Sequence, residues 1–127
     1  MPLELIAPRP RTAEFRTYAD DELQPDQVRI RSPYGAPKHG TELNMYRGTN
    51  PFQEKQYDSE WQVFRQTEQR PTPFPMGLGN MFVGEVTELG SQVTNIRISD
   101  MVAGYGNLRE THTLPASDLL VTPDSMA

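Results

Sequence analysis

The chain has 127 residues, and its 12 basic and 17 acidic side chains give a formal net charge of −5. A chain of this length fits one domain, and with no basic run it does not suit a nucleic-acid partner. It contains no cysteine, which excludes disulfides and cysteine-ligated zinc, and no apolar stretch approaches the roughly 20 residues that cross a membrane. Because the first residues also lack a signal-peptide pattern, we expect a soluble, cytoplasmic protein without a membrane partner.

Short strands are predicted in the N-terminal third of the chain. Residues 3–8 and 13–19 alternate loosely between apolar and polar side chains. The pattern is clearer in residues 27–35, where Val28 and Ile30 alternate with arginines, as in a strand with one face in water.

Two short helices are predicted next. Residues 41–47 are mostly good helix formers, Thr41 could cap their first turn, and Gly48 is placed to end the helix. A long polar stretch, residues 49–75, contains a capping-box pattern in residues 58–66, which predicts a second helix there.

The C-terminal half is typical of a β-barrel or sandwich. Apolar residues alternate with polar ones between glycine-rich turns, and almost nothing favours a helix. We predict strands over residues 83–89, 93–98, 101–103, 111–114 and 119–121.

The same half carries a spaced motif: Gly79-x-x-x-x-Gly84-Glu85-Val86-x-x-Leu89-Gly90-x-x-Val93, followed by Asp100-x-Val102. It resembles the catalytic domain of the medium-chain dehydrogenase/reductase superfamily, which includes the zinc-type alcohol dehydrogenases and their zinc-free relatives. The resemblance implies a mainly β fold, a GroES-like partly open β-barrel with a few short helices, over residues 1–127. It also implies a Rossmann cofactor domain C-terminal of this one, whereas the sequence contains no G-x-G-x-x-G motif that would begin one.

Departures from the family motifs bear on the metal. Zinc-dependent members carry Cys-Gly-Thr/Ser-Asp and Gly-His-Glu, where this chain has His39-Gly40-Thr41-Glu42 and Gly79-Asn80-Met81. A histidine alone does not hold a catalytic zinc, which needs about three protein ligands. The chain thus resembles a zinc-independent branch with a Gly-Thr-Glu motif, and we assign no metal ligand.

The resemblance implies roles for individual residues. Thr41 stands where the family keeps a substrate-facing hydroxyl, and such a donor can stabilise the charge that develops on a substrate oxygen. The resemblance implies the roles of the other residues as well. We expect Glu42 to be catalytic together with Thr41. We expect the substrate to be bound by His39, Asn80 and Tyr46, and the cofactor by Gly40 and Asn44.

Structural interpretations of these residues stay open. Thr41 could serve only as a helix cap, and Glu42 could serve only the helix dipole. His39 could be ordinary polar surface, and His112, in a predicted strand, could be a solvated or satisfied histidine. Trp61 and Phe64, two aromatic residues of the polar stretch 49–75, could pack this stretch against the barrel.

The sequence therefore predicts the substrate-binding catalytic domain of a zinc-independent oxidoreductase that uses NAD or NADP. Hydride would pass to or from a carbonyl or a conjugated alkene, and the domain would be inactive without a Rossmann domain in cis. A stand-alone GroES-like module for binding or oligomerisation is the main alternative, and a zinc enzyme with an unusual ligand set is a second. The small-molecule substrate, the choice of cofactor and any homo-oligomer cannot be read from these residues.

Overall fold

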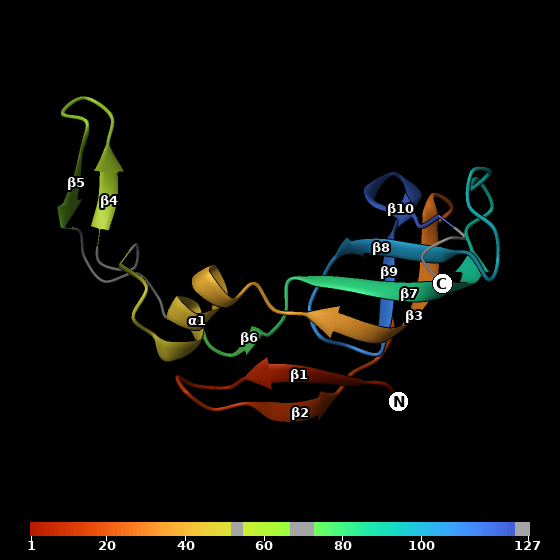
Figure 1. Cartoon of the computed structure of the whole chain (residues 1–127), viewed down its shortest axis with the longest axis horizontal. Coiled ribbons are helices and arrows are strands. Elements are labelled where there is room, and N and C mark those ends of the chain that lie inside the picture. Colours follow the sequence, from red (N-terminus) through yellow and green to blue (C-terminus); the bar gives the residue numbers. More distant parts are fainter. Residues whose placement is uncertain (52–54, 67–72, 124–127) are drawn as a thin grey trace.

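The computed structural model describes residues 1–51, 55–66 and 73–123. Strands dominate it and form one five-stranded, one three-stranded and one two-stranded sheet, all antiparallel (Figure 1). The mainly β fold expected from the sequence is confirmed, and its arrangement is that of a partly open barrel. No helix in the described part of the chain is long and apolar enough to cross a membrane.

The five-stranded sheet holds the core. Its order is β10-β8-β7-β3-β9, with β3 and β7 at the centre. The strands are β3 (Gln27–Ala36), β7 (Met81–Leu89), β8 (Met101–Tyr105), β9 (Thr111–Pro115) and β10 (Leu120–Val121). The buried cluster comprises Val28, Ile30, Phe82, Val86, Ile96, Val102 and Ala116. Because a strand turns alternate side chains to one face, Val28 and Ile30 enter this core while Arg29 and Arg31 lie outside it.

The three-stranded sheet has the order β2-β1-β6, formed by β1 (Leu3–Ala7), β2 (Glu14–Thr17) and β6 (Met76–Gly77). Backbone hydrogen bonds join it to the segment between β8 and β9. The N–H of Leu5 donates to the carbonyl of Leu108 at 2.8 Å, and the N–H of Leu108 donates to the carbonyl of Leu78 at 2.6 Å. These bonds fix the position of the loop between β6 and β7.

One α-helix and one hairpin lie outside these sheets. Helix α1 (His39–Arg47) follows β3 directly, and the hairpin of β4 (Lys55–Asp58) and β5 (Val63–Gln66) comes after it. Figure 1 shows the hairpin standing apart from both sheets, beyond α1.

The predicted strands over residues 3–8, 13–19, 27–35, 83–89, 101–103, 111–114 and 119–121 all correspond to observed strands, with ends shifted by a few residues. The helix predicted over residues 58–66 is wrong, because this segment is the turn and second strand of the hairpin. The Asp58 carboxylate accepts the N–H groups of Glu60 and Trp61 at 3.0 and 3.1 Å, a contact that can begin a turn as well as a helix. Gln62 then adopts φ 53°, which a helix cannot continue.

Two further expectations are wrong. Residues 93–98 form no strand: they lie between two turns, and of the predicted inward side chains only Ile96 is buried. Trp61 and Phe64 do not fix the hairpin to the barrel through buried contacts, since 64% and 53% of their surfaces are exposed.

His112 is neither solvated nor fully satisfied, contrary to expectation. It is 5% exposed on β9, its ring stacks on Phe82 at a centroid distance of 3.8 Å, and its Nε2 is buried without a hydrogen-bond partner in the described structure. Burial, together with the nearby charge of Arg109, lowers the pKa of His112 from 6.5 to about 4. The imidazole is therefore neutral in the folded chain at neutral pH.

This burial predicts a loss of stability in mild acid. Between pH 6.5 and 4 the unfolded chain binds a proton at His112 that the folded chain does not, so stability falls as the pH falls. At about 1.4 kcal/mol per pKa unit, we expect the free energy of unfolding to drop by about 2 kcal/mol from pH 7 to pH 5. Denaturant titrations of wild type and His112→Leu would measure it. Equal losses in both proteins would contradict the assignment.

Candidate functional site

Most of the predicted site residues lie on helix α1. The helix begins two residues earlier than predicted, at His39, and Lys38 occupies the cap position without a side-chain cap. Thr41 is thus the third residue of the helix and does not cap it, which removes the main structural interpretation of this side chain. The helix ends as predicted at Gly48, whose φ of 71° is the left-handed conformation that suits glycine.

The helix divides the predicted residues between two faces. His39, Glu42 and Tyr46 are spaced three and four apart and therefore share one face. Thr41 and Asn44 are three apart and lie on the opposite face, where both are exposed. The structure therefore separates the substrate-facing hydroxyl expected at Thr41 from the two proposed substrate-binding residues His39 and Tyr46.

The inner face of α1 borders a cavity of about 330 Å³. Its walls are almost entirely apolar, and His39 and Glu42 are the polar exceptions apart from the Tyr46 hydroxyl. The lining residues are Leu5, Ala13, Pro37, His39, Glu42, Leu43, Tyr46, Leu78 and Leu108. Because α1 buries none of its residues fully, it is held less by packing than by specific contacts.

Glu42 makes the most specific of these contacts. Its Oε1 accepts a hydrogen bond from the backbone N–H of Gly79, in the loop between β6 and β7. Its Oε2 is buried and has no partner in the described part of the chain. The Glu42 carboxyl group therefore ties the helix to this loop, which is a larger role than completing the helix dipole.

The loop at Gly79 has little freedom. Gly79 has φ 102°, and a Cβ there would lie 2.6 Å from the backbone nitrogen of Leu108. Asn80, the next residue, is fixed through its main chain: its N–H donates to Ala36 and its carbonyl accepts from Gly106, both at 3.0 Å. The Glu42–Gly79 bond thus fixes helix α1 against the loop that carries Asn80, while Thr41 lies on the face of the helix turned away from that bond.

The outer face of α1 is open to a ligand. Gly40 has no atom within 4 Å of the place where a Cβ would stand. The N-terminal end of any helix presents unpaired N–H groups and partial positive charge, which favours anions such as a cofactor phosphate. Near this end the exposed face carries the hydroxyl of Thr41 and an unobstructed backbone at Gly40, and the amide of Asn44 lies about one turn further along the helix.

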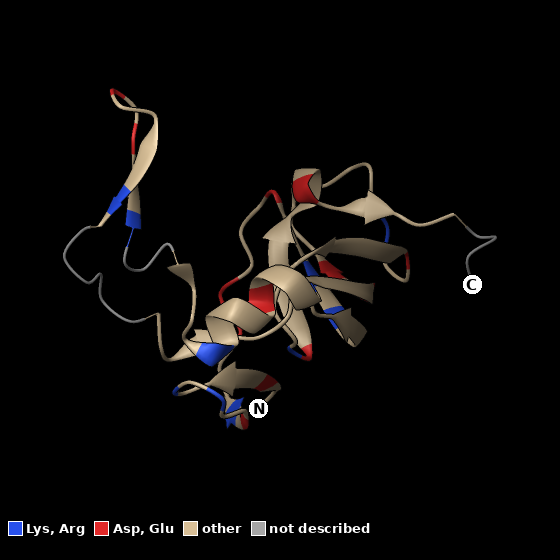
Figure 2. Cartoon of the chain, turned by 60° about the vertical axis from the view of Figure 1, so that its left-hand side comes forward, with Lys and Arg blue, Asp and Glu red and all other residues tan. Residues whose placement is uncertain are grey.

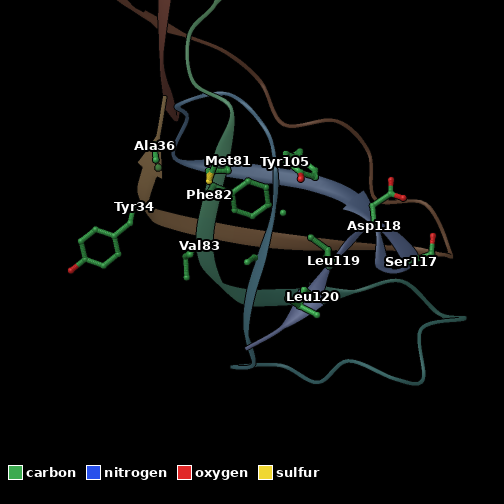
Figure 3. A pocket seen from close by; sticks show the side chains of 13 residues that line it. Tyr34, Ala36, Met81, Phe82, Val83, Tyr105, Ser117, Asp118, Leu119 and Leu120 are labelled. Atoms are coloured by element: carbon green, nitrogen blue, oxygen red, sulfur yellow. The ribbon is translucent and has the colours of Figure 1, made fainter. Parts of the chain in front are cut away.

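A second concave surface was not predicted from the sequence. A groove of about 570 Å³ lies on the five-stranded sheet, with apolar side chains from β3, β7, β8 and the region of β10 (Figure 3). Tyr34 and Tyr105, both on this groove, are 73% and 78% exposed. The sequence of β7 could have indicated this groove, because Met81 and Val83 are apolar on one face of the strand while Phe82 and Val86 are apolar on the other. Such a strand is typical of a sheet that is covered on both sides.

No three histidine, aspartate or glutamate side chains gather into a metal site among residues 1–51, 55–66 and 73–123. His39 and Asn80 stand at the two ligand positions of the family motif, and their segments are joined by the Glu42–Gly79 hydrogen bond and by the bond from the N–H of Asn80 to Ala36.

Comparison with known proteins identifies relatives among oxidoreductases. The chain is 42% identical over 115 residues to D-guloside 3-dehydrogenase of Escherichia coli, an alignment that covers 85% of this chain and 32% of that protein. It is 31% identical over 122 residues to a quinone oxidoreductase of Pseudomonas aeruginosa, covering 92% of this chain and 31% of the relative. The chain thus spans about a third of the length of the curated relatives it matches.

The fold has counterparts among solved structures. The Escherichia coli quinone oxidoreductase complexed with NADPH superposes with a TM-score of 0.67 over 98% of this chain and 34% of that one, at 14% identity. No protein-family model matches the sequence. The homologues and structural neighbours are members of the quinone oxidoreductase and alcohol dehydrogenase superfamily, the medium-chain dehydrogenases/reductases, and the resemblance found in the sequence is confirmed.

Two glycine variants test the geometry of the site. Gly79→Ala should destabilise the chain by about 2 kcal/mol or more, because the new Cβ meets the Leu108 backbone at a φ that L-residues avoid. Gly40→Ala should be neutral or stabilise by up to about 1 kcal/mol, since it adds a helix former in open space. Thermal or urea unfolding would measure both. Equal effects of the two variants would contradict the described loop.

Proposed function

We propose that this chain is the substrate-binding catalytic domain of an NAD(P)-dependent oxidoreductase that transfers hydride without zinc. The observation that supports the proposal is the exposed Thr41 hydroxyl on helix α1, a helix that the Glu42–Gly79 hydrogen bond holds in place. The oxidoreductase relatives, matched over most of this chain, support the reaction class.

A bound NAD(P) would supply the hydride chemistry: oxidation of an alcohol would transfer hydride from carbon to NAD(P)⁺ and release the hydroxyl proton, giving a carbonyl, NAD(P)H and H⁺. Thr41 would hydrogen-bond the substrate oxygen and stabilise the negative charge that develops there. Gly40 and Asn44, on the same open face, would accommodate the cofactor, with the helix N-terminus favouring its phosphates.

For Glu42 the geometry supports a proposal other than the catalytic role expected from the sequence. Its carboxyl group faces the inner side of α1 and binds Gly79, so it would act on the substrate only through the position of Thr41 and Asn80. We therefore propose Glu42 as a positioning residue. His39 and Tyr46 line the apolar cavity on this inner side. There they would contact an apolar part of the substrate.

For the substrate we propose a secondary hydroxyl of a glycoside. The support is the 42% identity to a guloside dehydrogenase, which exceeds the 31% identity to the quinone oxidoreductase. The complete protein should reduce NAD⁺ or NADP⁺ in the presence of methyl glycosides. Oxidation of NAD(P)H by benzoquinone, with no activity on glycosides, would instead favour a quinone reductase.

The partner in cis would be a Rossmann domain that follows this one. The relatives are about three times as long as the aligned region, and the apolar groove by β8 and β10 lies where the described chain approaches its end. An exposed apolar surface of this kind is typical of an interface.

Replacement of Thr41 tests the catalytic assignment. In the complete protein, Thr41→Val should lower kcat/KM about 10- to 1,000-fold, as the loss of one oxyanion donor does, and Thr41→Ser should retain most activity. Thr94→Val, at an exposed threonine of a distant loop, is the matched control. Steady-state kinetics would measure all three. Full activity of Thr41→Val would contradict the catalytic role of Thr41, whereas a complete protein that binds neither NAD(H) nor NADP(H) would favour a stand-alone binding module.

The proposed independence from zinc is tested by metal analysis. Purified protein should contain well under one zinc per chain, because no group of three histidine, aspartate or glutamate side chains that could hold the ion occurs in the described residues. Inductively coupled plasma mass spectrometry would measure the content in wild type and in His39→Ala. Stoichiometric zinc that disappears in His39→Ala would overturn the proposal and support a zinc enzyme with an unusual ligand set.

A further inference from the structure

The apolar cavity on the inner face of α1 has fixed walls. Three of its leucines are joined through their main chains: the N–H of Leu5 donates to Leu108, that of Leu108 to Leu78 and that of Leu78 to Leu5, at 2.8, 2.6 and 3.1 Å. The segment before β2 is tied to the helix, because the N–H of Arg11 donates to the carbonyl of Tyr46 at 2.9 Å. The chain itself therefore forms the cavity, as is usual for small-molecule sites.

Glu42 brings an unpaired polar atom to this apolar cavity. Its Oε1 accepts the N–H of Gly79, but its buried Oε2 has no hydrogen-bond partner in the described part of the chain. Leu78, which precedes Gly79, and Leu108, which packs against it, both line the cavity. The carboxyl group therefore lies where the cavity meets the loop. A buried oxygen without a donor costs free energy, which a donor group on a ligand would recover.

The helix supplies no cation for this carboxyl group. Figure 2 shows acidic and basic residues of α1 at separate places, and Glu42 lies in the first turn whereas Arg47 lies in the last. His39, which is one turn earlier on the same face as Glu42, forms no ion pair with it among the described residues. Glu42 is thus an acidic group without a basic partner at the edge of an apolar cavity.

The size and chemistry of the cavity define a class of ligand. An apolar cavity of about 150 Å³ holds benzene, so about 330 Å³ accommodates a ring with a short substituent. Water is a poor occupant, because a buried water normally makes about three hydrogen bonds and the walls are almost entirely apolar. A carboxylate binds a charged donor roughly twice as strongly as a neutral one, and the net charge of −5 also favours a cation.

We propose that this cavity binds a small apolar ammonium compound, whose ring or alkyl group lies against the leucines and whose ammonium group donates to Oε2 of Glu42. The carboxyl group then binds Gly79 with one oxygen and the ligand with the other. Because this group holds α1 at the loop, an occupied cavity also stabilises the helix that carries Thr41. The inference does not rest on the proposed oxidoreductase activity, since only contacts within this chain form the site.

Two sources can supply such an ammonium group. It can belong to an apolar part of the substrate, or to a separate molecule that binds beside the substrate site. The structure favours the separate molecule, because Thr41 lies on the face of α1 opposite to the cavity. Kinetics of the complete protein would distinguish the two, as described below.

Benzylamine, benzyl alcohol and benzoate test the chemistry, because they share a ring and differ in the charge and donor that they carry. To the 127-residue chain, benzylamine should bind with a Kd on the order of 0.1 to 1 mM, benzyl alcohol about tenfold more weakly, and benzoate not measurably. The chain has only two histidines, so proton NMR can locate the ligand. The resonances of His39 should shift, whereas those of His112, on β9 and outside the cavity, should not.

Two variants separate the charge from the space. Glu42→Gln keeps an oxygen for the N–H of Gly79 and should weaken benzylamine binding about tenfold, with little change for benzyl alcohol. Ala13→Phe keeps Glu42 but fills part of the cavity, so it should weaken both ligands about tenfold or more. Glu22→Gln, at an exposed glutamate outside the cavity, is the matched control and should bind as the wild type does. Circular dichroism would verify that each variant is folded.

Steady-state kinetics of the complete protein identifies the source of the ligand. Competition between benzylamine and the substrate would assign the ammonium group to the substrate, whereas a changed kcat with an unchanged KM would assign it to a separate molecule. The proposal is overturned if benzoate binds as tightly as benzylamine, or if the His39 resonances do not move at ten times the expected Kd. Equal binding of benzylamine by Glu42→Gln and Glu22→Gln would overturn it as well.

Discussion

The antiparallel pairing of β3 with β7 is the constraint on which the site depends. This pairing runs from Val28 opposite Leu89 to Ala36 opposite Met81. Helix α1 starts three residues after Ala36, and the Gly79–Asn80 loop ends immediately before Met81. The last pair of the ladder therefore sets the helix and the loop side by side, although they are about forty residues apart in sequence. The same strands place Val28, Ile30 and Val86 in the core, so stability and site geometry rest on one register.

Helix α1 performs two tasks because its residues point in different directions. Its inner face carries Glu42, which accepts a hydrogen bond from Gly79. This bond holds the helix in place, although none of the helix residues is buried in apolar packing. The outer face leaves Thr41 exposed, which the proposed contact of Thr41 with a substrate requires. Within the described residues, one buried oxygen of the Glu42 carboxyl group has no hydrogen-bond partner, which costs stability, so the contribution of Glu42 is to hold the helix at the loop rather than to raise stability.

Sequence patterns predicted the strands well and the irregular segments poorly. Val28 and Ile30 alternate with arginines, and alternation of that kind has few interpretations. The error at residues 58–66 arose because Ser59 and Gln62 have the spacing of a capping box, whereas in the fold Gln62 has φ 53° in a hairpin turn and Tyr57 pairs with Phe64 across the strands. The burial of His112 was not predicted, because Phe82 and β3 cover this side chain only when the sheet has formed.

The sequence by itself determined the fold class, the superfamily resemblance and the replacement of the zinc ligands, since each of these depends on residue types at fixed spacings. It also identified the residues of the Gly-Thr-Glu motif. The tertiary structure alone decided their arrangement: Thr41 is inside the helix and exposed, Glu42 is turned inward to Gly79, and His39 and Tyr46 border a separate cavity. The reason is that motif spacing fixes positions along the chain, whereas the direction of a helical side chain depends on where the helix begins and on the neighbours that hold it.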